Sequence, residues 1–125
     1  MLPYERFQAW QTCHELTQAV YRTTQRWPQN ELYGLTAQAR RAAFSAAANI
    51  AEGSAKRGAR EFRRYLDISL GSLSELSYIF LLAKDLDLLH QEEFASLDPL
   101  RDRAGKLVWG LCRSLTKTGG TQTAT

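Results

Sequence analysis

The stretch from Ala46 to Leu73 restricts the fold of this chain more than any other part of the sequence. An alanine-rich segment ends at Gly53, a short basic connection follows, and a long segment with apolar periodicity begins near Gly58. Glycine suits the end of a helix because it tolerates the left-handed backbone conformation. Gly58 and Glu61 resemble a capping box with glycine in the cap position. The stretch therefore predicts two packed helices joined by a tight elbow.

Apolar residues recur at helical spacing in four segments, which predicts four helices. These are expected at residues 6–26, 35–52, 58–88 and 91–116. The third segment follows a heptad pattern at Phe62, Leu66, Ser69, Leu73, Leu76, Phe80 and Ala83. Short connections between helices of comparable length favour an all-α fold, an antiparallel up-down-up-down four-helix bundle. We expect this single domain at residues 1–117 and a disordered polar tail at residues 118–125.

The third predicted helix carries more apolar residues than one packed face can cover. Beside the heptad it contains Ile79, Leu81, Leu82, Leu86, Leu88 and Leu89. On a chain of 14.2 kDa, exposing all of them would create a large apolar patch. Trp109 similarly lies off the apolar stripe of the fourth helix. We therefore expect a homo-oligomer; the alternative is a wide core face on a central helix.

Composition and motifs exclude several classes of protein. An apolar content of 44% excludes a disordered chain. No apolar run approaches the ~18 residues of a membrane span, and the first residues lack the order of a signal peptide. We expect a cytoplasmic protein with no membrane partner. His14 and Glu15 begin like a zinc-protease motif, but Gln18 stands where the second histidine belongs. We therefore expect that the protein is not an enzyme and has no cofactor or metal site. Cys13 and Cys112 are expected to be buried, inert thiols.

Charge is concentrated at the elbow. Five cations lie within nine residues there: Lys56, Arg57, Arg60, Arg63 and Arg64. Residues 85–102, in contrast, hold six acids and one cation. In an up-down bundle the elbow shares one pole with the start of the first helix and the end of the fourth. That pole gathers nine cations against six acids, so the whole net charge of +3 lies there.

A basic pole of this kind is the surface that sequence-independent phosphate binding requires. We expect RNA or DNA binding by the five elbow cations, with Arg40 and Arg41 as weaker candidates. Two alternatives remain open. In the first, the basic face would dock an acidic protein such as a polymerase subunit, and the chain would be an assembly or adaptor protein. In the second, the basic residues are only a solvated face.

Several residues around the elbow are interpreted as structural. Asn49 and Glu52 lie one helical turn apart and could form a polar network there. Gly53 and Glu61 belong to the expected helix ends. Gly71, followed by a serine, is interpreted as a notch for close helix packing rather than a phosphate cradle.

A combination of short motifs resembles a known bacterial family of four-helix bundles, whose members are often labelled as encoded by intervening sequences of 23S ribosomal RNA genes. The resemblance covers nearly the whole chain except the tail. Its central motifs are Glu-Leu-Tyr-Gly-Leu-Thr at 31–36, Arg-Arg-Ala-Ala at 40–43, Asn-Ile-Ala-Glu-Gly at 49–53, Glu-Phe at 61–62, Arg-Tyr-Leu at 64–66 and Leu-Gly-Ser-Leu at 70–73. The family often has Ile-Pro where this chain has Ala46 and Ala47, and serine where it has Gly58.

The resemblance implies a small cytoplasmic antiparallel bundle that assembles as a ring-shaped homopentamer. The same architecture occurs in the accessory variability proteins of diversity-generating retroelements, which are basic barrels that bind a reverse transcriptase and nucleic acid. The resemblance therefore adds a reverse transcriptase to the possible acidic partners. It names no activity for the family as a whole.

Overall fold

The computed structural model describes the backbone of residues 2–124 and the side chains of residues 2–115. Within these residues it contains four α-helices, two short 3-10 helices and no strand. The α-helices are α1 (Gln8–Thr24), α2 (Leu35–Ser54), α3 (Ala59–Asp85) and α4 (Gln91–Ala124), and the 3-10 helices are η1 (Pro3–Arg6) and η2 (Gln29–Glu31). The predicted all-α class is confirmed.

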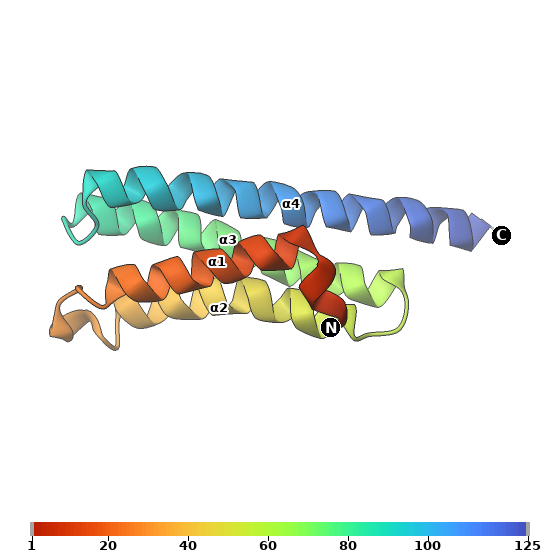
Figure 1. The fold of residues 1–125 in the computed structure, drawn as a ribbon, viewed down its shortest axis with the longest axis horizontal. Helices are drawn as coiled ribbons and strands as arrows, with labels where there is room; N and C mark the ends of the chain where they lie inside the picture. Colours follow the sequence, from red (N-terminus) through yellow and green to blue (C-terminus); the bar gives the residue numbers. More distant parts are fainter. Residues whose placement is uncertain (1, 125) are drawn as a thin grey trace.

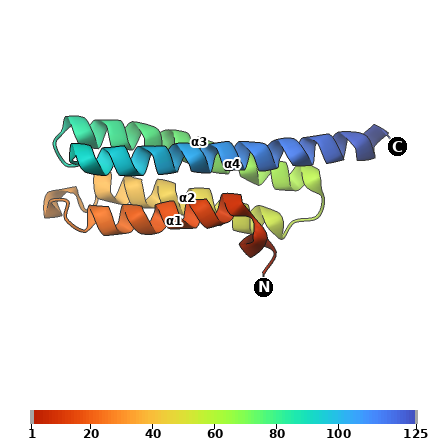
Figure 2. The same ribbon diagram turned by 45° about the horizontal axis from the view of Figure 1, so that its top comes forward.

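The four helices lie side by side, and the chain turns back at each of the three connections between them (Figures 1 and 2). α1 contacts α2 and α4, and α3 likewise contacts α2 and α4. α4 extends beyond the other three helices. The N-terminus, the α2–α3 connection and the last turns of α4 therefore lie toward one end of the molecule.

The core is built from small residues on α2 and large residues on α3. Ala39, Ala42, Ala43 and Ala46 of α2 are buried, so the neighbouring helices approach its backbone closely. All seven heptad residues of α3 are buried, as the periodicity predicts. The additional apolar residues in and just after α3 differ in burial. Ile79 and Leu89 are buried, Leu82 and Leu88 are half-buried, and Leu81 and Leu86 are exposed.

Helix α3 ends at Asp85, a few residues earlier than its apolar pattern suggests. Asp87 has a φ of 62°, which turns the backbone out of the helix. The N–H groups of Leu88 and Leu89 both donate to the carbonyl of Ala83, at 2.9 and 3.1 Å. The chain therefore folds Leu89 back into the core before α4 begins.

Helix α4 begins after His90, whose N–H donates to Oε1 of Glu93 at 2.9 Å. The helix continues through Pro99, so this proline does not end it. The backbone of α4 extends to Ala124, but side chains from residue 116 onward, and all of residue 125, lie outside the described residues. The polar tail expected at 118–125 stays a prediction.

Helix α3 is long and apolar enough to cross a membrane when judged by length and composition alone, because an 18-residue stretch of it has a mean hydropathy of 1.4. Its large residues Leu66, Leu73 and Phe80 are buried within the bundle. The core helix of a bundle passes the same test, so composition alone is weak support for a membrane span.

Candidate nucleic-acid interface

The elbow consists of residues 55–58, between the end of α2 and the start of α3. The N–H of Ala55 donates to the carbonyl of Glu52 at 3.2 Å, and that of Lys56 donates to the carbonyl of Gly53 at 3.1 Å. These two bonds tighten the last turn of α2. Gly58 then has a φ of +84°, and its carbonyl accepts the first hydrogen bond of α3 from Phe62. A Cβ at position 58 would meet no atom within 4 Å, so lack of space does not require glycine there. The positive φ does, because residues with a Cβ rarely adopt it.

Gly53 is required for a different reason. It lies inside α2, and Gly58 is the glycine with positive φ among the described residues. A Cβ at Gly53 would lie 2.7 Å from Cβ of Tyr65 and 2.9 Å from Cδ1 of Phe62. The prediction of a left-handed cap at Gly53 is therefore wrong. This glycine instead lets α3 pack directly against the backbone of α2.

The expected capping box is not formed. Gly58 has no side chain to cap α3, and no side-chain hydrogen bond caps this helix. Oε1 of Glu61 lies 3.5 Å from Nη2 of Arg64, one turn further along the same helix. The carboxylate of Glu61 therefore offsets part of the elbow charge.

Asn49 belongs to a polar network, but its partners differ from those expected. Its Nδ2 donates to the carbonyl oxygen of Ser45 at 2.8 Å and to Oγ of Ser45 at 3.0 Å. Oγ of Ser72 on α3 lies 2.8 Å from the same Ser45 hydroxyl. Glu52 is exposed and lies outside this network. The network is structural, because it joins α2 to α3.

Gly71 does not form the expected packing notch. It is exposed, and a Cβ there would meet no atom within 4 Å. The close contact between α2 and α3 is made elsewhere, at Gly53 and at Ser69. The buried hydroxyl of Ser69 donates to the carbonyl of Ala46 at 2.7 Å.

Three of the five cations at residues 56–64 have no acidic partner among the described side chains. Lys56, Arg57 and Arg60 are exposed, and no carboxylate among the described side chains lies within 4.0 Å of them. Arg64 is exposed as well but faces Glu61. The elbow thus presents uncompensated positive charge to solvent.

Tyr65 is a member of this site that the sequence analysis missed. Its half-buried ring lies 5.5 Å from Nζ of Lys56 and 5.9 Å from Cζ of Arg64. These are cation–π distances, and they draw two cations toward one aromatic side chain. The available signal was an aromatic residue directly after two arginines, because surfaces that bind single strands combine cations with aromatic rings.

Arg63 makes a hydrogen bond within the bundle. It is half-buried, and its Nη1 donates to the carbonyl of Leu115 on α4 at 3.3 Å. Nearby, Sγ of Cys112 lies 4.0 Å from Oδ1 of Asp67. Burial raises the pKa of the Cys112 thiol, the charge of Asp67 raises it further, and Arg63 opposes both. Arg63 therefore links α3 to α4 and is less available to a ligand than its neighbours.

Arg6 joins the site from the other end of the sequence. The rings of Phe7 and Phe62 lie 5.7 Å apart between centroids, which places the start of α1 beside the start of α3. The guanidinium of Arg6 lies 5.1 Å over the ring of Phe7 and is exposed. We define the cationic rim as Arg6, Lys56, Arg57, Arg60 and Arg64.

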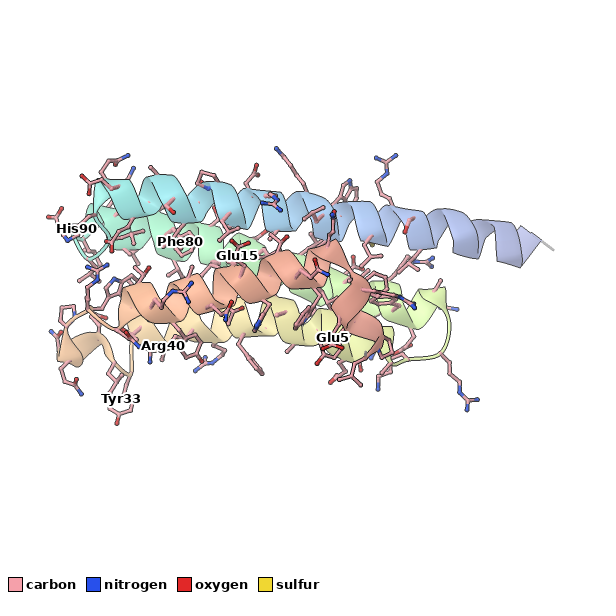
Figure 3. All side chains as sticks on the ribbon, viewed as in Figure 1. Glu5, Glu15, Tyr33, Arg40, Phe80 and His90 are labelled. Carbon is pink, nitrogen blue, oxygen red and sulfur yellow. The ribbon has the colours of Figure 1, made fainter. Side chains whose placement is uncertain are left out.

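The structure does not bring Arg40 and Arg41 to the rim. Figure 3 shows Arg40 toward the end of the molecule that carries Tyr33 and His90, away from Glu5. Arg40 is half-buried and donates from Nε to Thr24, whereas Arg41 is exposed, with Nη1 at 3.5 Å from Oε1 of Gln38. The weaker candidates are thus separated from the elbow by most of α2.

Metal-binding side chains do not cluster in the described part of the chain, where no group of three or more His, Cys, Asp or Glu could hold an ion. Cys13 is fully buried, and burial raises the pKa of its thiol to about 12. A thiol with such a pKa stays protonated at neutral pH and is a poor nucleophile.

Comparison with known proteins agrees with this architecture. Residues 5–110 match the family described as 23S rRNA-intervening sequence proteins. The chain belongs to this family. Among solved structures, it resembles a protein of unknown function from the S23 ribosomal protein family of Bacteroides thetaiotaomicron VPI-5482, with a TM-score of 0.75 and 19% sequence identity. The likeness covers 83% of this chain and 97% of that one, and at this identity it shows a common fold. No curated protein matches the sequence.

Proposed function

We propose that this member of the 23S rRNA-intervening sequence protein family binds RNA or DNA through phosphate contacts at the cationic rim and catalyses no reaction. The observation that carries the proposal is the state of Lys56, Arg57 and Arg60. All three are exposed, they lie within five residues of one another, and no described carboxylate pairs with them. Cations in this state can contact phosphates without first breaking an ion pair.

The physical basis is the release of counterions. Each Lys or Arg that neutralises a phosphate frees condensed cations from the nucleic acid, which gives affinity without base specificity. Tyr65, flanked by Lys56 and Arg64, adds an aromatic ring beside the charges. An unpaired base stacks on such a ring with a contribution of about 1–3 kcal/mol. The rim therefore suits single-stranded or looped nucleic acid better than a regular duplex.

We further propose that the up-down-up-down bundle assembles as a ring-shaped homopentamer. The support for assembly is a set of large apolar side chains that the single chain leaves exposed, namely Phe44, Ile68, Tyr78, Leu81, Leu86 and Trp109. Most of them lie on α3 and α4. A ring whose subunits point the same way would place several copies of the rim on one face and multiply the local positive charge.

Filter binding of a labelled single-stranded RNA across a salt series tests the rim. The test variant replaces Lys56, Arg57 and Arg60 with Gln. For single strands, the slope of log K against log salt is about −0.7 per neutralised phosphate, so the triple variant should lose up to about two slope units. The matched control replaces three exposed arginines outside the rim, Arg22, Arg41 and Arg103, and removes the same charge.

Two results would contradict the proposal. One is an absence of RNA binding by the unaltered protein at low salt, which would leave the rim available for an acidic protein partner instead. The other is an equal change of slope in the test and control variants, which would mean that net charge matters and the rim does not. A circular dichroism spectrum of each variant confirms that helix content is retained.

A further inference from the structure

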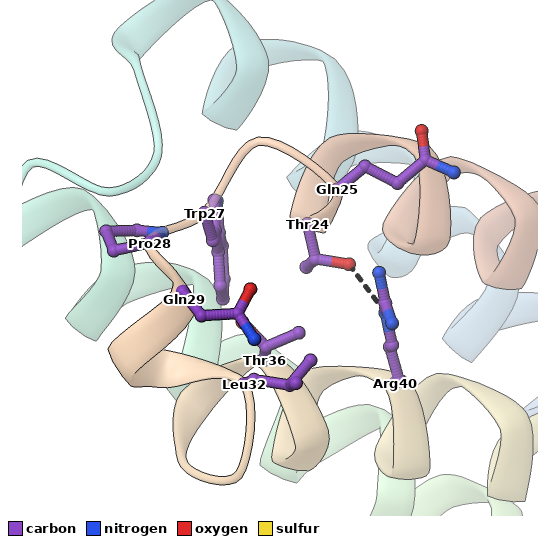
Figure 4. Close-up of a pocket in the computed structure, with 8 residues that line it drawn as sticks. All are labelled: Thr24, Gln25, Trp27, Pro28, Gln29, Leu32, Thr36 and Arg40. Carbon is purple, nitrogen blue, oxygen red and sulfur yellow. Dashed lines mark hydrogen bonds between the residues drawn. The ribbon is translucent and has the colours of Figure 1, made fainter.

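A cavity of about 180 Å³ lies where the end of α1, the 3-10 helix η2 and the start of α2 meet. Figure 4 shows Trp27, Thr36 and Arg40 among the residues that line it, together with Gln25 and Gln29. None of its lining residues is acidic. The cavity lies away from the cationic rim, at the opposite end of α2.

Two buried polar atoms at this cavity have no hydrogen-bond partner. They are Nε1 of Trp27 and Oγ1 of Thr36, and they are the two such side-chain atoms found in the described part of the chain. Trp27 is 8% exposed and Thr36 is 3% exposed. A buried tryptophan N–H normally finds an acceptor, and leaving a buried polar group unsatisfied costs about 1–3 kcal/mol. Both residues line the cavity, but each donor atom is itself covered, so a small turn of the side chain is needed before it can donate to an acceptor placed there.

Arg40 supplies a positive charge to the lining of the same cavity. Its Nε donates to Oγ1 of Thr24 at 2.9 Å (Figure 4), and the Thr24 hydroxyl in turn donates to the carbonyl of Val20 at 2.8 Å. The guanidinium also lies 4.8 Å over the ring of Tyr21. These contacts fix the guanidinium through one nitrogen. The Nη groups make no hydrogen bond or ion pair with any residue described in the structure.

Half-buried arginines in the described part of the chain differ in their partners. Like Arg40, Arg63 lacks an acidic partner there, but its Nη1 donates to the carbonyl of Leu115 at 3.3 Å. Arg101, which is similarly half-buried, has Asp98 at 2.8 Å from its Nε. Arg26, near the cavity in sequence, pairs with Glu93. Arg40 has no such partner, although part of its hydration is lost. A partly buried charge is stabilised by an opposite charge, and no described carboxylate lies within 4.0 Å of Arg40.

We propose that this cavity binds a small ligand that carries an oxyanion, a carboxylate or a phosphate, with Arg40 as the counter-charge. Trp27 Nε1 and the Thr36 hydroxyl donate hydrogen bonds to the ligand. The indole ring, Pro28 and Leu32 offer apolar surface to the rest of it. Guanidinium groups match the planar fork of a carboxylate or phosphate, and these charge-assisted bonds are stronger than neutral ones. The site is independent of nucleic-acid binding at the rim.

The test follows the indole N–H signals of ¹⁵N-labelled protein by NMR. The chain has three tryptophans, and a Trp27→Phe variant identifies the signal of Trp27. Sodium acetate and sodium phosphate are titrated separately at constant ionic strength, with sodium chloride as the reference. We expect a saturable shift of the Trp27 signal with at least one oxyanion while the exposed Trp109 signal stays in place. The acetate and phosphate arms show which of the two oxyanions the cavity takes.

Two variants test the assigned roles. Arg40→Gln should weaken binding about tenfold or more, because hydrogen bonds to charged groups contribute about 1.5–3 kcal/mol. Thr36→Val keeps the shape of the side chain, removes the hydroxyl and should weaken binding several-fold, which keeps the test valid if Arg40→Gln fails to fold. Arg41→Gln, an exposed neighbour, should leave the affinity unchanged. Absence of a saturable Trp27 shift with both anions, or equal losses in Arg40→Gln and Arg41→Gln, would overturn the proposal.

Discussion

Gly53 lies in the last turn of α2 and Gly58 is the last residue of the elbow, and each is glycine for a reason of its own. Gly58 has a positive φ that a residue with a Cβ adopts at a cost, whereas Gly53 is helical and is pressed against Phe62 and Tyr65. The sequence indicated that both glycines belong to a joint between helices. It could not assign their roles, because the close approach at Gly53 depends on how α3 lies against α2.

Replacing Gly53 with Ala should destabilise the protein by about 1–3 kcal/mol, because the new Cβ would overlap Tyr65 and Phe62. The favourable helix propensity of alanine, about 1 kcal/mol, does not offset this overlap. The control is Gly71→Ala on α3, where space is open and alanine should stabilise by roughly 0.5–1 kcal/mol. Urea unfolding at one fixed protein concentration measures both. Equal effects of the two substitutions would show that α2 and α3 do not touch at Gly53.

Cys13 should make stability depend on pH in the alkaline range. Burial raises the pKa of its thiol from 9.0 to about 12 in the folded protein. The unfolded chain loses this proton at lower pH than the folded protein does. Below about pH 9 the thiol is protonated in both states and the folded state keeps its full stability, which is then lost as the pH rises toward 12. Between these limits the loss is at most ~1.4 kcal/mol per pH unit. Urea unfolding from pH 8 to 11 should show a steeper decline for the unaltered protein than for Cys13→Ala; parallel curves would refute this.

At the scale of the helices, α3 is the element whose sequence gave the most information. Its heptad placed all seven core residues correctly, because apolar spacing reports which face is buried. The end of α3 was less predictable. Its apolar pattern continues to Leu89, yet the helix stops at Asp85, since Asp87 adopts a positive φ and the chain folds back onto Ala83. Apolar spacing carries no information about such a backbone turn.

Ser69 shows how a polar residue can occupy a heptad position. Its buried hydroxyl donates to the carbonyl of Ala46 and thereby joins α3 to α2. Ser69→Ala should therefore destabilise the protein by about 1 kcal/mol, although alanine is the better helix former. Ser74→Ala, at an exposed position of the same helix, is the matched control and should be neutral or slightly stabilising. Thermal unfolding of the two variants separates these outcomes, and a stabilised Ser69→Ala variant would contradict the assigned role.

At the scale of the whole molecule, the proposals rest on three features that the sequence revealed unequally. The cationic rim was visible as a run of charges, and the expected topology already put Arg6 at the same pole. The position of Tyr65 beside Lys56 and Arg64 required the structure. The cavity at Arg40 was not visible in the sequence. It is marked by two buried donors without hydrogen-bond partners, Trp27 and Thr36, and only the packing of the folded chain shows that they lack partners. The exposed apolar side chains were expected from the excess of leucine on α3, but only the structure separates Leu81 and Leu86 from the buried Leu89.

The exposed apolar side chains should hold copies of this chain together. Tyr78 on α3 is 63% exposed and Trp109 on α4 is 55% exposed, so both are available to a second copy and neither is needed for the core. Tyr78→Glu and Trp109→Glu should each shift the protein toward smaller species with little change in helix content, because a buried interface disfavours an unpaired charge. Tyr33→Glu is the control, since Tyr33 is also a tyrosine and is 93% exposed, but lies in the connection before α2. Sedimentation velocity at micromolar concentration measures the mass of each variant. A mass of 14.2 kDa for the unaltered protein would remove the basis for the ring, and with it the expected multiplication of rim charge on one face.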